Sequence, residues 1–177
     1  MANSWQFKQR VSLSHNLNLQ RLVQFYVWET PVPNTSQKGI SLEQLGWEKG
    51  TLNTLHARMR KKTGFPISSR WITCPAASIQ SRLAEFDRLD SYDCTFEFAI
   101  HTQKDGLSKT KALFYFIRNS FAHGGFRISK FNGETYYALE NRQDDAIKGR
   151  AVLKESTLLA WVRIVQAGYE RDEKAHS

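Results

Sequence analysis

The residues best suited to chemistry form one short segment, Arg118-Asn119-Ser120-Phe121-Ala122-His123-Gly124, which directly follows the apolar run 112–117. A run of this kind is expected to be buried, so polar side chains at its end must find partners or line a cavity. A histidine can both donate and accept a proton near neutral pH. The segment therefore predicts acid–base chemistry at His123.

The spacing of these residues predicts where they lie on a helix. Gly124-Gly125 is typical of a helix that ends in a left-handed cap, which places His123 in the last turn, where helical carbonyls favour a charged imidazolium. Asn119 and His123 stand four apart and share a face, whereas Arg118 lies about 140° away from His123 at roughly 100° per residue. One chain therefore keeps Arg118 and His123 apart unless the helix loosens at its end.

The segment resembles the motif of the HEPN superfamily, an Arg commonly followed by Asn or Asp and then by a His. The likeness covers residues 113–126 and rests on Arg118-Asn119, on His123, on the apolar helix before them and on the glycines after them. It implies an all-α fold, a single HEPN-like helical bundle of four to five main helices. Our prediction adds a β-hairpin inserted after the motif helix.

The resemblance also implies a function, metal-independent cleavage of RNA. His123 would act as general base or acid on the ribose 2′-hydroxyl and the leaving oxygen, Arg118 would hold the scissile phosphate, and Asn119 would orient the imidazole or the substrate. The products would be a 2′,3′-cyclic phosphate and a 5′-hydroxyl. Two copies of the motif would face each other in a homodimer with a composite active site.

The class to which such ribonucleases belong implies a toxin or effector of a prokaryotic defence or stress system, with an antitoxin or regulatory protein as partner. In toxins silenced by a nucleotidyltransferase, a tyrosine stands two residues after the histidine, and here that position is Gly125. That mode of control is therefore not supported.

A structural role for the motif stays open beside the catalytic one. A histidine near a helix end often caps the last carbonyls, and an arginine can extend out of an apolar helix to solvent. The alternative function is a non-catalytic dimeric module that binds RNA, a nucleotide or a protein partner.

Composition limits the remaining possibilities. A chain of 177 residues suits one domain over 1–177, with a frayed tail at 172–177. The net charge of +8 fits RNA as partner, although a basic surface also serves solubility. Cys74 and Cys94 form no CxxC pair, and we expect no metal or cofactor. No signal core, membrane span, catalytic serine triad, phosphate-binding glycine loop or EF-hand is visible, so we expect a cytoplasmic protein.

Periodic apolar residues predict helices at 14–29, from Ser41, at 52–62, at 77–90, up to the motif and at 156–171. We expect a loop at 64–75 and either a strand or a further helical piece at 93–100. Alternating residues on both sides of Asn132-Gly133 predict a hairpin of 126–131 with 134–139.

Basic residues near these elements are candidate phosphate contacts, and a tyrosine on the hairpin can stack on a base. A solvated helix end at 58–62 and simple packing of the hairpin are the alternatives. The predicted RNA contacts are Arg58, Arg60, Lys61, Lys62, Lys109, Lys111, Arg127, Lys130 and Tyr136.

Overall fold

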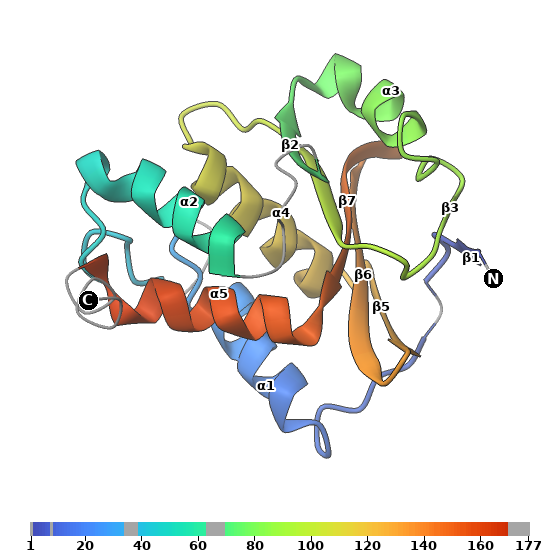
Figure 1. Ribbon diagram of the computed structural model, residues 1–177, viewed down its shortest axis with the longest axis horizontal. Coiled ribbons are helices and arrows are strands. Elements are labelled where there is room, and N and C mark those ends of the chain that lie inside the picture. The colour runs from blue at the N-terminus through green and yellow to red at the C-terminus, as the bar shows by residue number, and fades with distance from the viewer. Residues whose placement is uncertain (1, 8, 34–38, 63–69, 170–177) are drawn as a thin grey trace.

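A five-stranded mixed sheet forms the centre of the protein in the computed structural model, which describes residues 2–7, 9–33, 39–62 and 70–169 (Figure 1). The strands are β1 (Asn3–Ser4), β2 (Trp71–Cys74), β3 (Ser91–Tyr92), β4 (Phe98–Thr102), β5 (Phe126–Phe131), β6 (Glu134–Gln143) and β7 (Ala146–Lys154). The α-helices are α1 (Leu17–Val23), α2 (Leu52–Lys62), α3 (Ile79–Ala84), α4 (Lys109–Ala122) and α5 (Glu155–Ala167).

The sheet has the strand order β2-β4-β7-β6-β5. β2 and β4 are parallel, and every other neighbouring pair is antiparallel. β1 and β3 form a separate two-stranded sheet. β7 therefore lies in the middle and joins the hairpin β5-β6 to the parallel pair β2-β4.

The two faces of the sheet carry two separate hydrophobic clusters. Tyr137 and Leu139 of β6 pack with α1, α2, α4 and α5, which cover one face (Figure 1). The alternate residues, Tyr136 and Ala138, pack with Trp5 and residues of α3 on the other face. This period of two is what a strand buried on both faces requires.

The prediction of an all-α bundle is wrong, because the structure is mixed α/β. β2 lies in the predicted loop 64–75, of which residues 64–69 are outside the described part of the chain. β4 begins within the stretch 93–100, where a strand was one of the two predicted outcomes, and it is buried on both faces. β7 follows a two-residue turn at Asp144-Asp145, both with positive φ. An isolated hairpin is marginally stable, and β7 gives it the third strand it needs.

The hairpin around Asn132-Gly133 is confirmed, with Phe131 paired to Glu134 and positive φ at both turn residues. The motif helix α4 is also confirmed, and the Ser108 hydroxyl accepts a hydrogen bond from the Lys111 amide.

Other predicted elements differ in extent from those observed. α1 continues as a π-helical turn at Gln24–Trp28. The helix and this turn together fall within the predicted helix 14–29. Ser41 and Gln44 make the reciprocal capping hydrogen bonds, but only a turn follows, since Gly46 takes φ +86°. α3 ends at Ala84, short of the predicted residue 90. The tail 172–177 lies outside the described residues.

One buried histidine ties the sheet to the helical layer. His101 of β4 is fully buried, its Nε2 lies 3.3 Å from Thr73 Oγ1, and its ring stacks on Phe116 of α4 at a centroid distance of 5.8 Å. Burial lowers the pKa of His101 from 6.5 to about 4. The imidazole is therefore neutral in the folded protein at neutral pH.

We predict that the free energy of unfolding falls as the pH drops from about 6.5 to about 4. In this window the unfolded chain binds a proton at His101 that the folded chain does not, so acid favours unfolding. The change His101→Phe keeps a ring against Phe116 and should make this pH dependence shallower. Urea unfolding at several pH values measures it, with His15→Gln at an exposed position as the matched control. An unchanged slope in His101→Phe would contradict the assignment.

Candidate active site at the end of helix α4

A cleft of about 400 Å³ opens at the C-terminal end of α4, and we call it the α4 cleft. Three elements form it: α4 with its cap, the end of β4 with the loop that follows, and the hairpin between β6 and β7. Its lining residues are Ala76, Thr102, Gln103, Lys104, Ala112, Tyr115, Phe116, Arg118, Asn119, His123, Asn141, Arg142, Gln143 and Lys148. All three motif residues therefore reach one cavity.

The end of α4 brings Arg118 and His123 of a single chain to the same cleft. His123 is the C-cap residue, with φ −102° and ψ 10°, so its backbone no longer has α-helical dihedral angles. Its backbone N–H still bonds the Asn119 carbonyl at 3.0 Å, while its ring is exposed at the cleft. Despite their angular separation on a regular helix, both side chains line the α4 cleft. A second chain is not required to unite the two groups.

Arg118 is held in place without a negative partner. Its Nη1 donates to Asn119 Oδ1 at 2.9 Å, and its Nε is buried with no hydrogen-bond partner. Among the described residues no carboxylate lies within ion-pair distance of Arg118. The side chain of Asn119, only 8% exposed, thus contacts the guanidinium, and its role toward the imidazole or the substrate stays a prediction.

The cap of α4 is fastened to the sheet through its glycines. Gly124 has φ +70°, the left-handed conformation that ends a helix. Gly125 donates to the Ser120 carbonyl at 2.8 Å and accepts from the Glu140 amide of β6 at 2.7 Å. A Cβ on Gly125 would lie 2.1 Å from the Glu140 carbonyl oxygen. Only glycine permits this approach.

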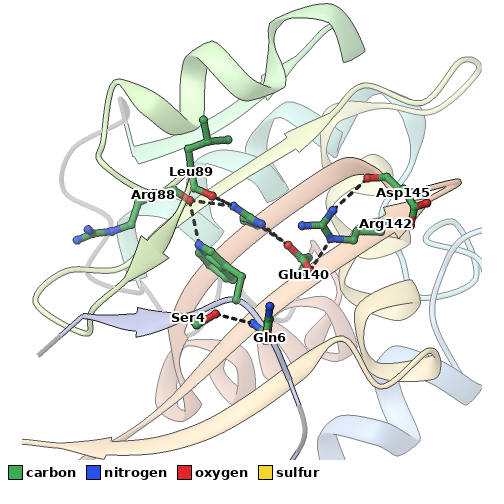
Figure 2. A network of polar contacts seen from close by, with 9 residues as sticks. Ser4, Gln6, Arg88, Leu89, Glu140, Arg142 and Asp145 are labelled. Carbon is green, nitrogen blue, oxygen red and sulfur yellow. Dashed lines mark hydrogen bonds and ion pairs between the residues drawn. The ribbon is translucent and has the colours of Figure 1, made fainter.

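Glu140 is held by two arginines, as Figure 2 shows for Arg142. Its Oε2 accepts from Arg150 Nε at 2.7 Å, and its Oε1 accepts from Arg142 Nε at 2.9 Å. Arg150 is 2% exposed and also donates to the carbonyls of Arg88 and Leu89. Burial lowers the pKa of Arg150, and the attraction of Glu140 opposes that shift. The network fixes Arg142 at the rim of the α4 cleft.

A β-bulge delivers a further cation to the cleft. Asn141 pairs with Gly149 and Arg142 with Ile147, so Lys148 is the extra residue of β7. Ile147 packs in the cluster on the α3 side of the sheet. Gly149 faces α4, since a Cβ there would lie 2.6 Å from the Phe116 ring. With strict alternation Lys148 would share the face of Arg150, but the bulge lets it line the α4 cleft instead.

Asn141 contributes a second nearly buried amide to the cleft. It is 8% exposed and lines the cavity, and its side chain makes no hydrogen bond within the described part of the chain. Buried amides normally have partners, so a ligand in the cleft would find an open donor and acceptor here.

The α4 cleft is strongly basic. Lys104, Arg118, Arg142 and Lys148 line it, and the described lining residues include no Asp or Glu. Lys104 Nζ lies 5.2 Å from the centroid of the Tyr115 ring, which adds an aromatic surface beside the cations. A cavity with this charge, a proton-transfer group and stacking surface suits a phosphate ester that carries a base.

The RNA contacts predicted from the sequence lie elsewhere. Arg58 and Arg60 pack over the rings of Trp47 and Trp71, and each donates to a backbone carbonyl, of Tyr169 and Trp71 respectively. Lys61 is exposed on α2, and the side chain of Lys62 lies outside the described part.

The remaining predicted contacts lie on α4 and on the hairpin β5-β6. Lys109 is exposed, Lys111 donates to Glu43 at 3.4 Å, and Tyr136 is 6% exposed with Lys154 over its ring. Arg127 and Lys130 lie on β5. None of the nine lines the α4 cleft. The cations that do so, Lys104, Arg142 and Lys148, were missed: Lys104 lies in a loop, Arg142 lies on β6 beyond the predicted end of the hairpin at residue 139, and Lys148 lies on β7, which the sequence did not predict.

Comparisons of the chain with protein-family models, curated proteins and solved structures gave no match. The resemblance to the HEPN motif therefore rests on residues 113–126. In the described part of the chain no three His, Cys, Asp or Glu side chains gather as metal ligands. Across the same residues no helix has both the length and the apolar character needed to span a membrane.

We predict that Gly125→Ala lowers the free energy of unfolding by roughly 2–3 kcal/mol, because the methyl group would force the α4 cap away from β6. Gly50→Ala is the matched control, since a Cβ there meets nothing within 4 Å, and its stability should be unchanged or slightly raised. Thermal or urea unfolding measures both. Equal stabilities of the two variants would show that the contact of Gly125 with Glu140 does not hold the cap.

Proposed function

We propose that the α4 cleft is the active site of an endoribonuclease that cleaves RNA by attack of the ribose 2′-hydroxyl. The observation that carries the proposal is the convergence of Arg118 and His123 of one chain on a cleft with four cationic side chains and, among its described residues, no carboxylate. RNA presents the matching chemistry, a chain of phosphate anions with a hydroxyl next to each one.

His123 carries the proton transfer in this mechanism. Its imidazole takes the proton of the 2′-hydroxyl, the 2′-oxygen bonds to phosphorus, and the bond from phosphorus to the 5′-oxygen breaks. The departing oxygen takes a proton from the imidazolium or from water. The products are a 2′,3′-cyclic phosphate and a 5′-hydroxyl. The exposed ring at the rim of the cleft suits this role, because it is open to a bound strand.

The cations stabilise the charge that develops on the phosphate. Arg118 is preorganised for this task, since Asn119 holds one edge of its guanidinium and no carboxylate within ion-pair distance in the described chain competes for the rest. Lys148, delivered by the bulge, adds a second charge from the opposite wall. Because Asn119 holds Arg118 before substrate arrives, little reorganisation of this guanidinium is needed in the transition state.

The biological setting stays a prediction. A toxin or effector of a prokaryotic defence or stress system, acting in the cytoplasm and controlled by an antitoxin or regulatory protein, is the setting that the motif implies. A homodimer also stays a prediction, although one chain by itself unites Arg118 and His123 at the cleft.

We predict that His123→Ala and Arg118→Ala each lower the rate of RNA cleavage at saturating RNA by on the order of 10²–10³. Circular dichroism and thermal unfolding should stay close to wild type in His123→Ala, because that ring is exposed. Labelled single-stranded RNA in excess chelator gives the rate, and the exposed pair His15→Ala and Arg21→Ala serves as control. Normal cleavage by both site variants would refute the proposal. RNA binding with no cleavage by the wild-type protein would favour the non-catalytic module.

We predict further that RNA affinity falls steeply with salt, with a log–log slope of about −0.7 for each phosphate neutralised on a single strand. Lys104→Gln and Lys148→Gln should each reduce the slope by about 0.7, whereas Lys61→Gln and Lys130→Gln, outside the cleft, should leave it unchanged. Fluorescence anisotropy with the His123→Ala variant measures affinity without cleavage. A slope that responds only to Lys61 or Lys130 would move the RNA path to α2 or to the hairpin.

A further inference from the structure

A second cleft, of about 650 Å³, lies on the other side of the α4 cap. Gly124 and Gly125 line it, whereas His123 lines the α4 cleft. Arg142 lines both clefts. Apart from its own chain neighbours, no heavy atom lies within 4 Å of the position that a Cβ on Gly124 would take, so the cap between the clefts is open at this residue. A strand bound in one cleft can therefore continue into the other.

The two clefts differ in charge. The α4 cleft has four cations, whereas the second cleft is lined by Asp90, Glu140 and Asp145 with Arg142 and Arg150. Glu140 and Arg150 are paired with each other. The carboxylates of Asp90 and Asp145 make no hydrogen bond or ion pair among the described residues. The second cleft thus favours phosphate less than the α4 cleft does, and the carboxylates of Asp90 and Asp145 offer acceptors to a neutral group that carries N–H donors.

Arg142 is placed to join the two sites. Its Nε donates to Glu140, and its Nη1 donates to the Asp145 carbonyl at 3.0 Å, as Figure 2 shows. Its Nη2 makes no hydrogen bond or ion pair within the described part of the chain, and 45% of its side chain is exposed. The guanidinium is therefore fixed by two bonds, with one edge left for a phosphate that lies between the clefts.

We propose that the second cleft binds the nucleobase next to the scissile phosphate, and that it selects guanine. This inference rests on the proposed function of the α4 cleft. Guanine presents N1–H and N2–H side by side, which one carboxylate accepts as two parallel hydrogen bonds. Uracil offers a single N–H between two carbonyls, and the carbonyl oxygens repel a carboxylate. The half-buried ring of Phe7, which packs on Trp5 at a centroid distance of 6.1 Å, supplies an apolar surface for the base.

Mononucleotide binding tests the inference apart from catalysis. The probes are guanosine, inosine and uridine 5′-monophosphates and inorganic phosphate, titrated calorimetrically into wild-type protein. The guanosine nucleotide should bind roughly tenfold more tightly than the inosine nucleotide, which lacks the 2-amino donor, and than the uridine nucleotide. Asp90→Asn with Asp145→Asn should abolish this difference and leave the affinity for inorganic phosphate unchanged. Arg118→Ala should weaken phosphate binding and keep the preference.

The matched control is Asp87→Asn with Asp144→Asn, which removes the same charge from the same two turns at positions outside the cleft. It should keep the guanine preference. Equal affinities for the three nucleotides, or a preference that survives loss of Asp90 and Asp145, would overturn the inference. A guanine preference in a protein that does not cut RNA would support this inference and refute the proposed ribonuclease. Cleavage of RNA together with equal affinities for the three nucleotides would support the proposed ribonuclease and overturn the guanine inference.

Discussion

Glu140 is the residue on which the geometry of both clefts depends. Its backbone amide bonds the carbonyl of Gly125, its side chain binds Arg150, and its second oxygen orients Arg142. A buried ion pair adds little net stability, since desolvation of both charges offsets their attraction, but loss of one partner leaves an uncompensated charge that costs about 3–5 kcal/mol. The main effect of Glu140 is therefore positional. It fixes the register of the α4 cap on β6.

This register holds the C-terminal end of α4 in place beside the α4 cleft. The last turn of a helix frays when its carbonyls lack partners. Here the cap is held by the contact of Gly125 with β6 on one side and by the packing of Phe116 and Phe121 in the helical core on the other. His123 thus stands at the end of a helix that cannot shift along the sheet. The bulge at Lys148 depends on the same pair of strands, so the two walls of the α4 cleft are set by one hydrogen-bonded ladder.

The sequence predicted the local features well and the long-range ones poorly. The motif helix and the Asn132-Gly133 hairpin follow from contacts within a few residues, and the structure contains both. The parallel pair β2-β4 joins segments with no mutual signature in the sequence, and β4 overlaps the stretch 93–100, for which both a strand and a helical piece were expected. Lys148 and Asn141 belong to the cleft only because a bulge and a buried register place them there. The one available signal was Asp144-Asp145, a pair that tolerates positive φ and can close a hairpin.

The distribution of carboxylates explains why two adjacent clefts have different chemistry. Glu140 satisfies Arg150 and part of Arg142, and Asp93 pairs with Arg88 at 2.8 Å, so the arginines on that side of the sheet are compensated within the fold. Arg118 has no such partner in the described chain. Its buried Nε is desolvated, and no hydrogen bond among the described residues compensates for this cost. Arg60 also lacks a carboxylate partner among the described residues, but its guanidinium lies over the Trp71 ring and donates to the Trp71 carbonyl, whereas Arg118 lines the α4 cleft. A guanidinium with no carboxylate partner at a cleft is what a site for an external anion requires, because an internal carboxylate would compete with the phosphate for the same donor.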